Sequence, residues 1–398
     1  MGHAVSARPF EFTSPPRIVF GEGTLAQAGG IVASLGTRAL VVEGSSGRAA
    51  PLVALLRAAG VEPAALLRVP GEPTTALVEE GVALARRARC DVVVALGGGS
   101  VIDAGKAVSA LLTNPGEPLD YLEVVGRGTP LAERAAPFVA IPTTAGTGAE
   151  VTRNAVLLVE SARVKVSLRS PLMLPAVALV DPELTYTVPP DVTASTGLDA
   201  LAQCLEPFVT PHATPLTDAV AREGLRRAAG ALRRAVADGA DVAARRDMAV
   251  ASLCGGLALA NAKLGAVHGF AAPLGGMFPL PHGVACARLL APVVRANVNA
   301  LRRDETRAGT HDALARYDEA ARLLTGDPGA RADDAAAWLA DLADALGIPP
   351  LAAYGVAPSD VPEVVAQARR ASSMQGNPVV LTDVELGDVL RAAVGARG

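Results

Sequence analysis

The sequence predicts an α/β domain with a parallel sheet over residues 1–187, followed by an all-α domain over residues 188–398. In the first part, short runs of β-branched residues alternate with longer stretches rich in Ala, Leu and Arg, which is the pattern of βα units. In the second part, long Ala- and Leu-rich stretches contain few β-branched clusters. Pro189 and Pro190 mark the change, because two prolines hold the chain extended.

Each predicted element is short and regular. Strands are expected where apolar β-branched residues cluster, over residues 38–42, 91–96, 138–141 and 177–180. Helices are expected where apolar residues recur at helical spacing, over residues 50–59, 75–88, 217–237, 243–261 and 333–346.

Length, charge and composition favour a folded two-domain protein that does not bind nucleic acid. The chain has 398 residues, which suits two domains at about 150 residues or more each. It carries 36 basic and 40 acidic residues, a net charge of −4, and no long run of like charges. Nucleic acid is therefore not an expected partner. Half of the residues are hydrophobic, which argues against disorder.

Cysteine spacing and hydropathy indicate the compartment. Cys90, Cys204, Cys254 and Cys286 are scattered without a CxxC pair, as expected of buried free thiols in a reducing environment. Residues 1–20 lack the apolar core of a signal peptide, so we expect a cytoplasmic protein. The apolar stretch 251–278 contains polar residues and many glycines, so no membrane span is expected.

A glycine loop follows the second predicted strand of the first domain. Gly97-Gly98-Gly99-Ser100 comes directly before a predicted helix. Glycines let a backbone approach a pyrophosphate, and the amides and dipole at a helix N-terminus favour its negative charge. Ser100 and Asp103 have the spacing of a capping box. The alternative is an ordinary tight turn with a helix cap.

A second loop, Pro142 to Gly148, follows the next strand and contains Thr143, Thr144 and Thr147. Hydroxyl and amide donors there would lie beside the glycine loop, because parallel strands end at the same edge of a sheet. Two such loops predict a crevice for one elongated ligand.

Rare residues in the second domain form a candidate metal site. His268 and His282 are two of only five histidines, and both lie in glycine-rich segments. Asp199 and Gln203 are four residues apart on one face of a predicted helix. One carboxylate and two imidazoles leave an open position on a divalent metal, as catalysis requires. The alternative is a carboxylate near a helix N-terminus and two hydrogen-bonded, partly buried imidazoles without metal.

These blocks resemble the iron-containing alcohol dehydrogenases over nearly the whole chain, a family with maleylacetate reductase and glycerol dehydrogenase relatives. The matching segments, in order, are Phe20-Gly21, Gly97-Gly98-Gly99-Ser100 with Asp103 and Lys106, Pro142 to Gly148, Val180-Asp181-Pro182, Gly197-Leu198-Asp199-Ala200, His268, and Pro281-His282-Gly283.

The resemblance implies a dinucleotide-binding α/β domain and a helical metal- and substrate-binding domain, the architecture also found in dehydroquinate synthase. It implies NAD or NADP, a divalent Fe or Zn, an alcohol or aldehyde substrate, and a homodimer or larger homo-oligomer. The implied catalytic metal ligands are Asp199, His268 and His282, with Gln203 as a weaker candidate. The implied cofactor contacts are Gly97, Gly98, Gly99, Ser100, Asp103, Thr143, Thr144, Thr147 and Lys165.

Four positions depart from the family pattern. Gln203 stands where the family often has a further histidine ligand, which predicts weaker metal binding or a changed metal preference. Ala272 stands where the family often has a second histidine near the nicotinamide. After the strand at 38–42, Gly44 and Ser45 stand near the position where NAD-preferring relatives tend to carry Asp. This segment would tolerate a 2′-phosphate, although Glu43 could still reach a ribose, so the sequence slightly favours NADP.

The predicted activity is metal-dependent hydride transfer between a nicotinamide and an alcohol or carbonyl carbon. A maleylacetate reductase, which works without metal on a dicarboxylate, is the first alternative; Arg153, Lys165, Arg169 and Lys263 could serve it, but Asp199 argues for a metal. A dehydroquinate synthase-like lyase is disfavoured because Gly283 is not followed by an acidic residue. The last alternative is a non-catalytic nucleotide-binding protein.

Overall fold

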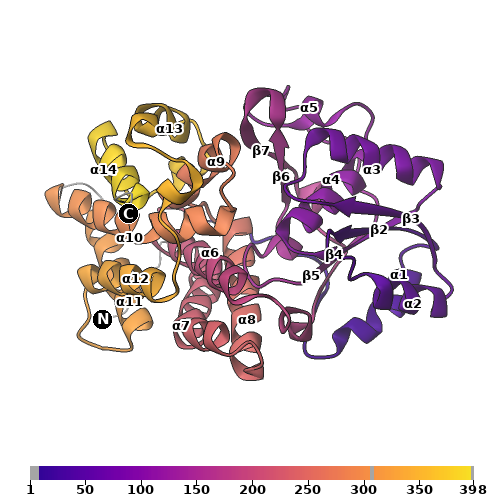
Figure 1. The fold of residues 1–398 in the computed structure, drawn as a ribbon, viewed down its shortest axis with the longest axis horizontal. Helices are drawn as coiled ribbons and strands as arrows, with labels where there is room; N and C mark the ends of the chain where they lie inside the picture. Colours follow the sequence, from indigo (N-terminus) through magenta and orange to yellow (C-terminus); the bar gives the residue numbers. More distant parts are fainter. Residues whose placement is uncertain (1–8, 305–308, 396–398) are drawn as a thin grey trace. The chain divides into compact units, whose positions relative to one another are not determined.

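The computed structural model describes residues 9–304 and 309–395, and the chain folds into two compact units (Figure 1). The α/β unit comprises Thr13–Thr144 and Gly148–Thr187. The helical unit comprises the described residues of 1–12, 145–147 and 188–398. Residues 1–8, part of the segment in which no signal peptide was expected, lie outside the described residues.

The α/β unit contains a six-stranded parallel sheet in the order β1-β8-β5-β4-β2-β3. The strands are β1 Ile18–Phe20, β2 Arg38–Gly44, β3 Glu62–Val69, β4 Val92–Gly97, β5 Phe138–Pro142 and β8 Val177–Val180. The predicted fold class and all four predicted strands are confirmed. Sequence analysis missed β1 and β3, which are the two edge strands; β3 contains Pro63 and lacks a β-branched cluster, while β1 has only three residues.

Helices cover both faces of this sheet. α1 (Ala28–Ala33) and α2 (Ala50–Ala58) pack against one set of strand residues, which includes Val41 and Val94. α3 (Thr75–Arg87) and α4 (Gly99–Thr113) pack against the opposite set, which includes Leu40 and Val93. Burial on both faces explains why the central strands are continuously apolar.

An antiparallel hairpin completes the α/β unit together with the short helix α5 (Pro118–Tyr121). Its strands are β6 (Asn154–Val159) and β7 (Val164–Arg169), with Leu157 opposite Val166. Sequence analysis did not predict this hairpin. Short 3-10 helices connect the elements of both units: η1 Thr24–Gln27, η2 Ala149–Val151, η3 Glu160–Ala162, η4 Pro171–Met173, η5 Pro182–Thr185, η6 Leu351–Tyr354, η7 Pro358–Asp360 and η8 Ser372–Gly376.

The helical unit contains the helices predicted for the second half, and further ones. They are α6 Pro190–Val209, α7 Pro215–Ala237, α8 Val242–Asn261, α9 Ala266–Met277, α10 His282–Arg303, α11 Thr310–Thr325, α12 Ala332–Ala345, α13 Val361–Ala368 and α14 Asp383–Val394. Small residues let α6, α7 and α8 approach closely: a Cβ at Gly197 would overlap Leu232, and one at Gly224 would overlap Cys204.

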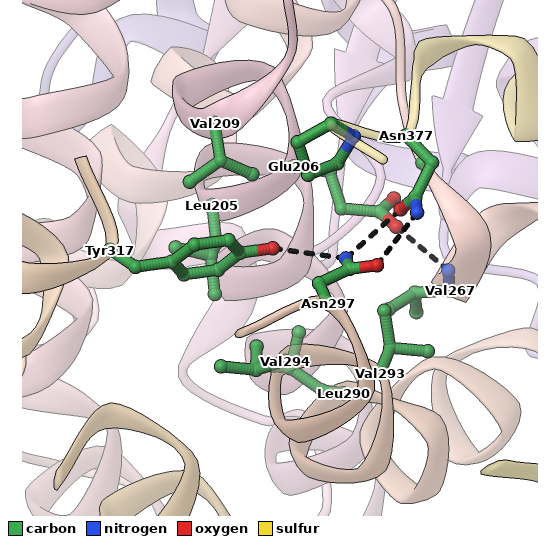
Figure 2. A pocket seen from close by; sticks show the side chains of 12 residues that line it. Leu205, Glu206, Val209, Val267, Leu290, Val293, Val294, Asn297, Tyr317 and Asn377 are labelled. Carbon is green, nitrogen blue, oxygen red and sulfur yellow. Dashed lines mark hydrogen bonds between the residues drawn. The ribbon is translucent and has the colours of Figure 1, made fainter. Parts of the chain in front are cut away.

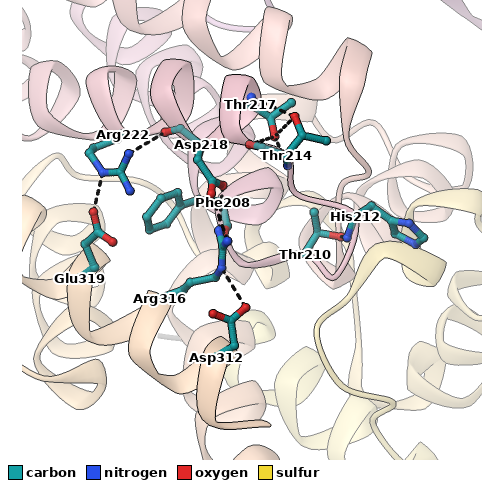
Figure 3. A network of polar contacts seen from close by, with 10 residues as sticks. All are labelled: Phe208, Thr210, His212, Thr214, Thr217, Asp218, Arg222, Asp312, Arg316 and Glu319. Carbon is teal, nitrogen blue, oxygen red and sulfur yellow. Dashed lines mark hydrogen bonds and ion pairs between the residues drawn. The ribbon is translucent and has the colours of Figure 1, made fainter. Parts of the chain in front are cut away.

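The C-terminal end of α6 is held by a polar network (Figure 3). Arg316 on α11 binds Asp218 on α7 through two nitrogens, at 2.7 and 3.0 Å, and donates to the carbonyl of Phe208 at 2.9 Å. The guanidinium carbons of Arg222 and Arg316 lie 5.3 and 5.6 Å from the centroid of the Phe208 ring. Cation–π and charge-assisted bonds thus fix α6, the helix that carries Asp199.

Within the described residues, α10 is the one helix long and apolar enough by itself to cross a membrane, and 72% of its apolar window is buried inside the structure. The bent pair of α8 and α9 passes the same test as one broken segment. Buried core helices of soluble proteins also pass a test of length and apolar composition, so these helices are weak evidence for a membrane span.

Candidate active site

Three residues distant in sequence converge in the helical unit. Asp199 is on α6, His268 is on α9, and His282 is the first residue of α10. The Oδ1 atom of Asp199 lies 3.3 Å from Nε2 of His268 and 3.7 Å from Nε2 of His282. Asp199 and His268 are buried, whereas the His282 side chain is 31% exposed.

A fourth side chain, Cys286, joins this group. Its Sγ lies 3.6 Å from Nε2 of His282 and 3.8 Å from Nε2 of His268. Donor atoms of Asp199, His268, His282 and Cys286 all lie within 4.8 Å of one another. Sequence analysis missed Cys286 because it treated all four cysteines as buried thiols. Its position one helical turn after His282 was the available signal.

Two buried oxygens in the same region lack hydrogen bonds. Asp199 Oδ1 and Gln203 Oε1 are both buried without a hydrogen-bond partner, and the two residues lie one turn apart on α6. Unpaired buried acceptors cost roughly 1–3 kcal/mol each, so they need a partner that the protein itself does not supply. A carboxylate oxygen, two imidazole nitrogens and a thiol sulfur fit a divalent transition metal.

Glu206 holds His268 in place. Its Oε2 lies 2.6 Å from Nδ1 of His268, and its Oε1 accepts from the Val267 amide at 2.7 Å. A hydrogen bond from Nδ1–H to the carboxylate leaves Nε2 as the nitrogen free to bind a metal. Sequence analysis did not identify this residue.

A buried polar network extends this support (Figure 2). Asn377 Oδ1 accepts from the Ala266 amide at 3.2 Å and from Asn297 at 3.0 Å, and Asn297 donates in turn to the Tyr317 hydroxyl at 3.0 Å. α9 has no side-chain cap of its own at Gly265. Asn377 and Glu206 therefore satisfy the first two amides of the helix that presents His268.

The electrostatics of the site favour a positive charge beside Asp199. Burial alone would raise the pKa of Asp199, but His282 and His268 lower it to about 2. Burial opposes ionisation of His268, yet Cys286, Asp199 and Glu206 raise its pKa well above the usual value. Burial raises the pKa of the Cys286 thiol to about 12. A divalent cation beside the Asp199 carboxylate would take the place of the protons that His268 and Cys286 hold.

The glycine loop lies where the sequence placed it, between β4 and α4. A Cβ on Gly97 would come 2.6 Å from Cβ of Val101, so this position requires glycine for close strand–helix packing. The predicted capping box of Ser100 and Asp103 is wrong, because the N-cap of α4 is Gly98 and has no side-chain cap.

Asp103 instead points to the hairpin. Its carboxylate accepts from the Val156 amide at 3.0 Å and lies 3.6 Å from Nζ of Lys106. Fully buried Lys106 donates to the carbonyls of Ala149 and Asn154 at 2.8 and 2.7 Å. These two residues tie α4 to β6 and η2.

The two predicted loops lie side by side. Gly97 pairs with Pro142 in the sheet, and the Thr143 amide donates to the Gly97 carbonyl at 3.0 Å. A Cβ on Gly98 would lie 3.4 Å from Oγ1 of Thr144. Thr147 follows in the same loop, just before Gly148, which has a left-handed φ of 57°. Gly99 and Ser100 form the first turn of α4, and both are partly exposed.

The remaining predicted cofactor residues lie elsewhere in the α/β unit. Gly44 is the last residue of β2, and Ser45 follows it in a turn in which the Gly47 amide donates to the Gly44 carbonyl at 3.2 Å. The Glu43 carboxylate accepts from the Ala49 amide at 3.1 Å and from Arg68 at 3.0 Å, so it is already engaged. Lys165 on β7 is buried and pairs with Glu72 at 2.8 Å.

Comparisons with known proteins agree with this architecture. The family model described as iron-containing alcohol dehydrogenase matches residues 15–182, and the model of that family's C-terminal part matches residues 193–394. The chain is 36% identical over 397 residues to 1,3-propanediol dehydrogenase of Klebsiella pneumoniae, covering 98% of this chain and 100% of the relative.

Two solved structures show the same fold. A 1,3-propanediol oxidoreductase has a TM-score of 0.87 at 34% identity, covering 97% of this chain and 100% of the other. The sulfoacetaldehyde reductase of Bifidobacterium kashiwanohense, solved with NAD⁺, has a TM-score of 0.85 at 29% identity, covering 98% and 100%.

Fold, site and comparisons together define an oxidoreductase that acts on CH–OH groups. The chain belongs to the iron-containing alcohol dehydrogenase family. The resemblance inferred from the sequence is thereby confirmed, and the oxidoreductase is favoured over a lyase.

Proposed function

We propose that this protein is a metal-dependent, NAD(P)-linked alcohol dehydrogenase or aldehyde reductase. The observation that carries the proposal is the convergence of Asp199 with Nε2 of His268 and His282 at 3.3 and 3.7 Å. The reaction would be hydride transfer between a nicotinamide and an alcohol or carbonyl carbon of a small substrate. A homodimer or larger homo-oligomer, as the sequence resemblance implies, is part of the proposal and is testable by light scattering.

The metal would be divalent Fe or Zn, held by Asp199, His268 and His282, with Gln203 as a further candidate ligand. When bound, it supplies Lewis-acid polarisation of the substrate oxygen. Asp199 contributes the negative charge that balances the cation in a buried position. Glu206 orients His268, and the partly exposed His282 marks the side from which a substrate can enter.

In the α/β unit, the glycine loop Gly97 to Ser100 would bind the pyrophosphate through backbone amides and the N-terminal end of α4. Thr143, Thr144 and Thr147 would add donors from the neighbouring loop. We assign supporting roles to Asp103 and Lys165, because both are engaged within the protein.

The cofactor would be NADP in preference to NAD. Glu43 is engaged by Arg68 and by the Ala49 amide, which weakens its ability to bind ribose hydroxyls. Arg68 has a side chain that is 61% exposed, and its guanidinium lies beside the Gly44–Gly47 turn. An exposed arginine at this place suits a 2′-phosphate. The NAD⁺ bound in the solved sulfoacetaldehyde reductase favours NAD instead, so the assay includes both cofactors.

The decisive experiment couples elemental analysis to activity. The purified protein is assayed with NADH and NADPH against a panel of aldehydes, before and after chelation, and after reloading with Fe²⁺ or Zn²⁺. We expect a near-stoichiometric metal content, loss of activity on chelation, and recovery on reloading. Asp199→Asn should lose both metal and activity.

Each remaining alternative has its own outcome. Full activity of the metal-free protein would overturn the proposal and favour a maleylacetate reductase. Cofactor binding without turnover across the whole panel would favour a non-catalytic nucleotide-binding protein.

A further inference from the structure

Cys286 lies in the group of candidate metal ligands, although sequence analysis did not include it. We propose that the Cys286 thiolate is the fourth protein ligand and that the resulting Asp-His-His-Cys set selects zinc over ferrous iron. This inference rests on the proposed function, because it names a further ligand of the same metal.

The spacing of the four donor atoms suits one tetrahedral ion. Two atoms bound to a tetrahedral zinc with bonds of about 2.0–2.3 Å lie roughly 3.3–3.6 Å apart. The separations here are 3.3 and 3.7 Å from Asp199 Oδ1 to the two imidazole nitrogens, and 3.6 and 3.8 Å from Cys286 Sγ to the same nitrogens. Small side-chain movements would bring all four atoms to a common centre.

Local structure fixes the sulfur in this place. His282 and Cys286 are one turn apart on α10, so their side chains lie on the same face of the helix. Cys286 is fully buried, and its Sγ contacts the two imidazoles. A buried thiol pointing at two imidazoles and an unpaired carboxylate oxygen has more reason to bind a metal than to fill space.

The chemistry of sulfur decides the metal. Thiolates are soft ligands that favour zinc, whereas carboxylate and amide oxygens suit harder ions. As the sulfur–metal bond forms, the thiol proton is released to solvent. Gln203 offers the competing choice, since its buried Oε1 is unpaired, but an amide oxygen would not favour zinc in this way.

Four protein ligands still permit catalysis. Zinc sites can expand to five ligands, so a substrate oxygen can add to the four. The partly exposed side of His282 leaves room for that approach.

Cobalt spectroscopy of the full-length protein tests this assignment without relying on activity. The protein is stripped with a chelator and titrated with Co²⁺, whose visible bands report binding and whose near-ultraviolet charge-transfer band reports a thiolate ligand. We expect both signals in the wild type. Cys286→Ser should retain cobalt binding but lose the charge-transfer band, and it should bind zinc at least about tenfold more weakly in a competition titration.

Cys254→Ser is the matched control, because Cys254 is also buried in the helical unit and its thiol pKa is likewise raised by burial, to about 11. It should keep both signals. Circular dichroism tests whether each variant is folded. If Cys286→Ser is not folded, Cys286→Ala takes its place.

The outcomes separate the two proposals. Cobalt binding without a charge-transfer band, or a band that persists in Cys286→Ser, would overturn the role of Cys286 and leave the metal-dependent function standing. Failure of the wild type to bind any cobalt would overturn both.

Discussion

Glu206 and His268 form a buried hydrogen bond of 2.6 Å between Oε2 and Nδ1. The same carboxylate accepts from the Val267 amide, so Glu206 fixes both the ring of His268 and the start of α9. Carboxylates in this position typically raise the basicity of a metal-bound imidazole and set its tautomer.

The Glu206→Gln substitution should therefore weaken metal binding by about 10- to 100-fold without removing a ligand. The amide retains an acceptor for Val267 but loses the charge that holds Nδ1–H. Chelator competition with Zn²⁺ measures the change. Glu363→Gln, on the exposed surface of α13, is the control and should bind metal as the wild type does. Unchanged affinity in Glu206→Gln would show that the pair serves only the fold.

Gly283, next to His282, has no space for a side chain. A Cβ there would lie 2.6 Å from the Ser195 carbonyl oxygen and 2.8 Å from its carbon, both of them backbone atoms of α6. We expect Gly283→Ala to destabilise the protein by about 1–3 kcal/mol and to weaken metal binding, because α10 must move away from α6. Chemical denaturation and metal titration measure the two effects.

Gly230→Ala supplies the matched control for this substitution. Gly230 lies within α7, and a Cβ there meets nothing within 4 Å. Alanine should stabilise that helix by about 0.5–1 kcal/mol. A Gly283→Ala protein as stable as the Gly230→Ala protein would contradict the steric argument.

Glu150 makes the stability of the α/β unit depend on pH. Burial raises its pKa to about 7, despite the opposing effect of its own backbone amide and of Lys106. Its folded pKa is above the ordinary value of 4.5, so its contribution to stability is fully present below pH 4.5 and is lost as the pH rises through 7.

The Glu150→Gln variant removes this dependence. The difference between its free energy of unfolding and that of the wild type should grow in favour of the variant by ~1–3 kcal/mol between pH 5 and 8. Denaturation at several pH values measures the difference, with exposed Glu160→Gln as the control. Parallel profiles for wild type and Glu150→Gln would show that the carboxyl ionises normally.

Arg68 should determine cofactor preference if NADP is bound. A charge-assisted hydrogen bond to a 2′-phosphate contributes about 1.5–3 kcal/mol, so Arg68→Ala should bind NADPH at least about tenfold more weakly. NADH affinity should stay the same or increase, because the substitution removes the ion pair between Arg68 and Glu43 and leaves Glu43 able to bind ribose hydroxyls. Fluorescence titration gives both dissociation constants. Arg57→Ala, on the exposed surface of α2, is the control, and an unchanged NADPH-to-NADH ratio in Arg68→Ala would reject the assignment.

Much of the fold follows from local sequence. The buried strands at Val92–Gly97 and Phe138–Pro142 are continuous apolar runs, and the glycine loop follows from three glycines between a strand and a helix. The edge strand Glu62–Val69 lacks such a signal. The hairpin β6–β7 carries one that sequence analysis did not use, since apolar and polar residues alternate strictly over Val164–Arg169. The place of Glu62–Val69 at the sheet edge depends on its packing beside β2, which its own residues do not report.

The sequence alone singled out Asp199, His268 and His282 as candidate metal ligands, because histidine is rare in this chain and their segments match a known family. Only the tertiary structure placed Cys286 beside both imidazoles, joined Glu206 to His268, and turned Asp103 toward the hairpin. The physical reason is that residue type and helical spacing predict only which side chains share a face within a few turns of one helix. The surroundings of a buried side chain depend on which distant helices pack against it.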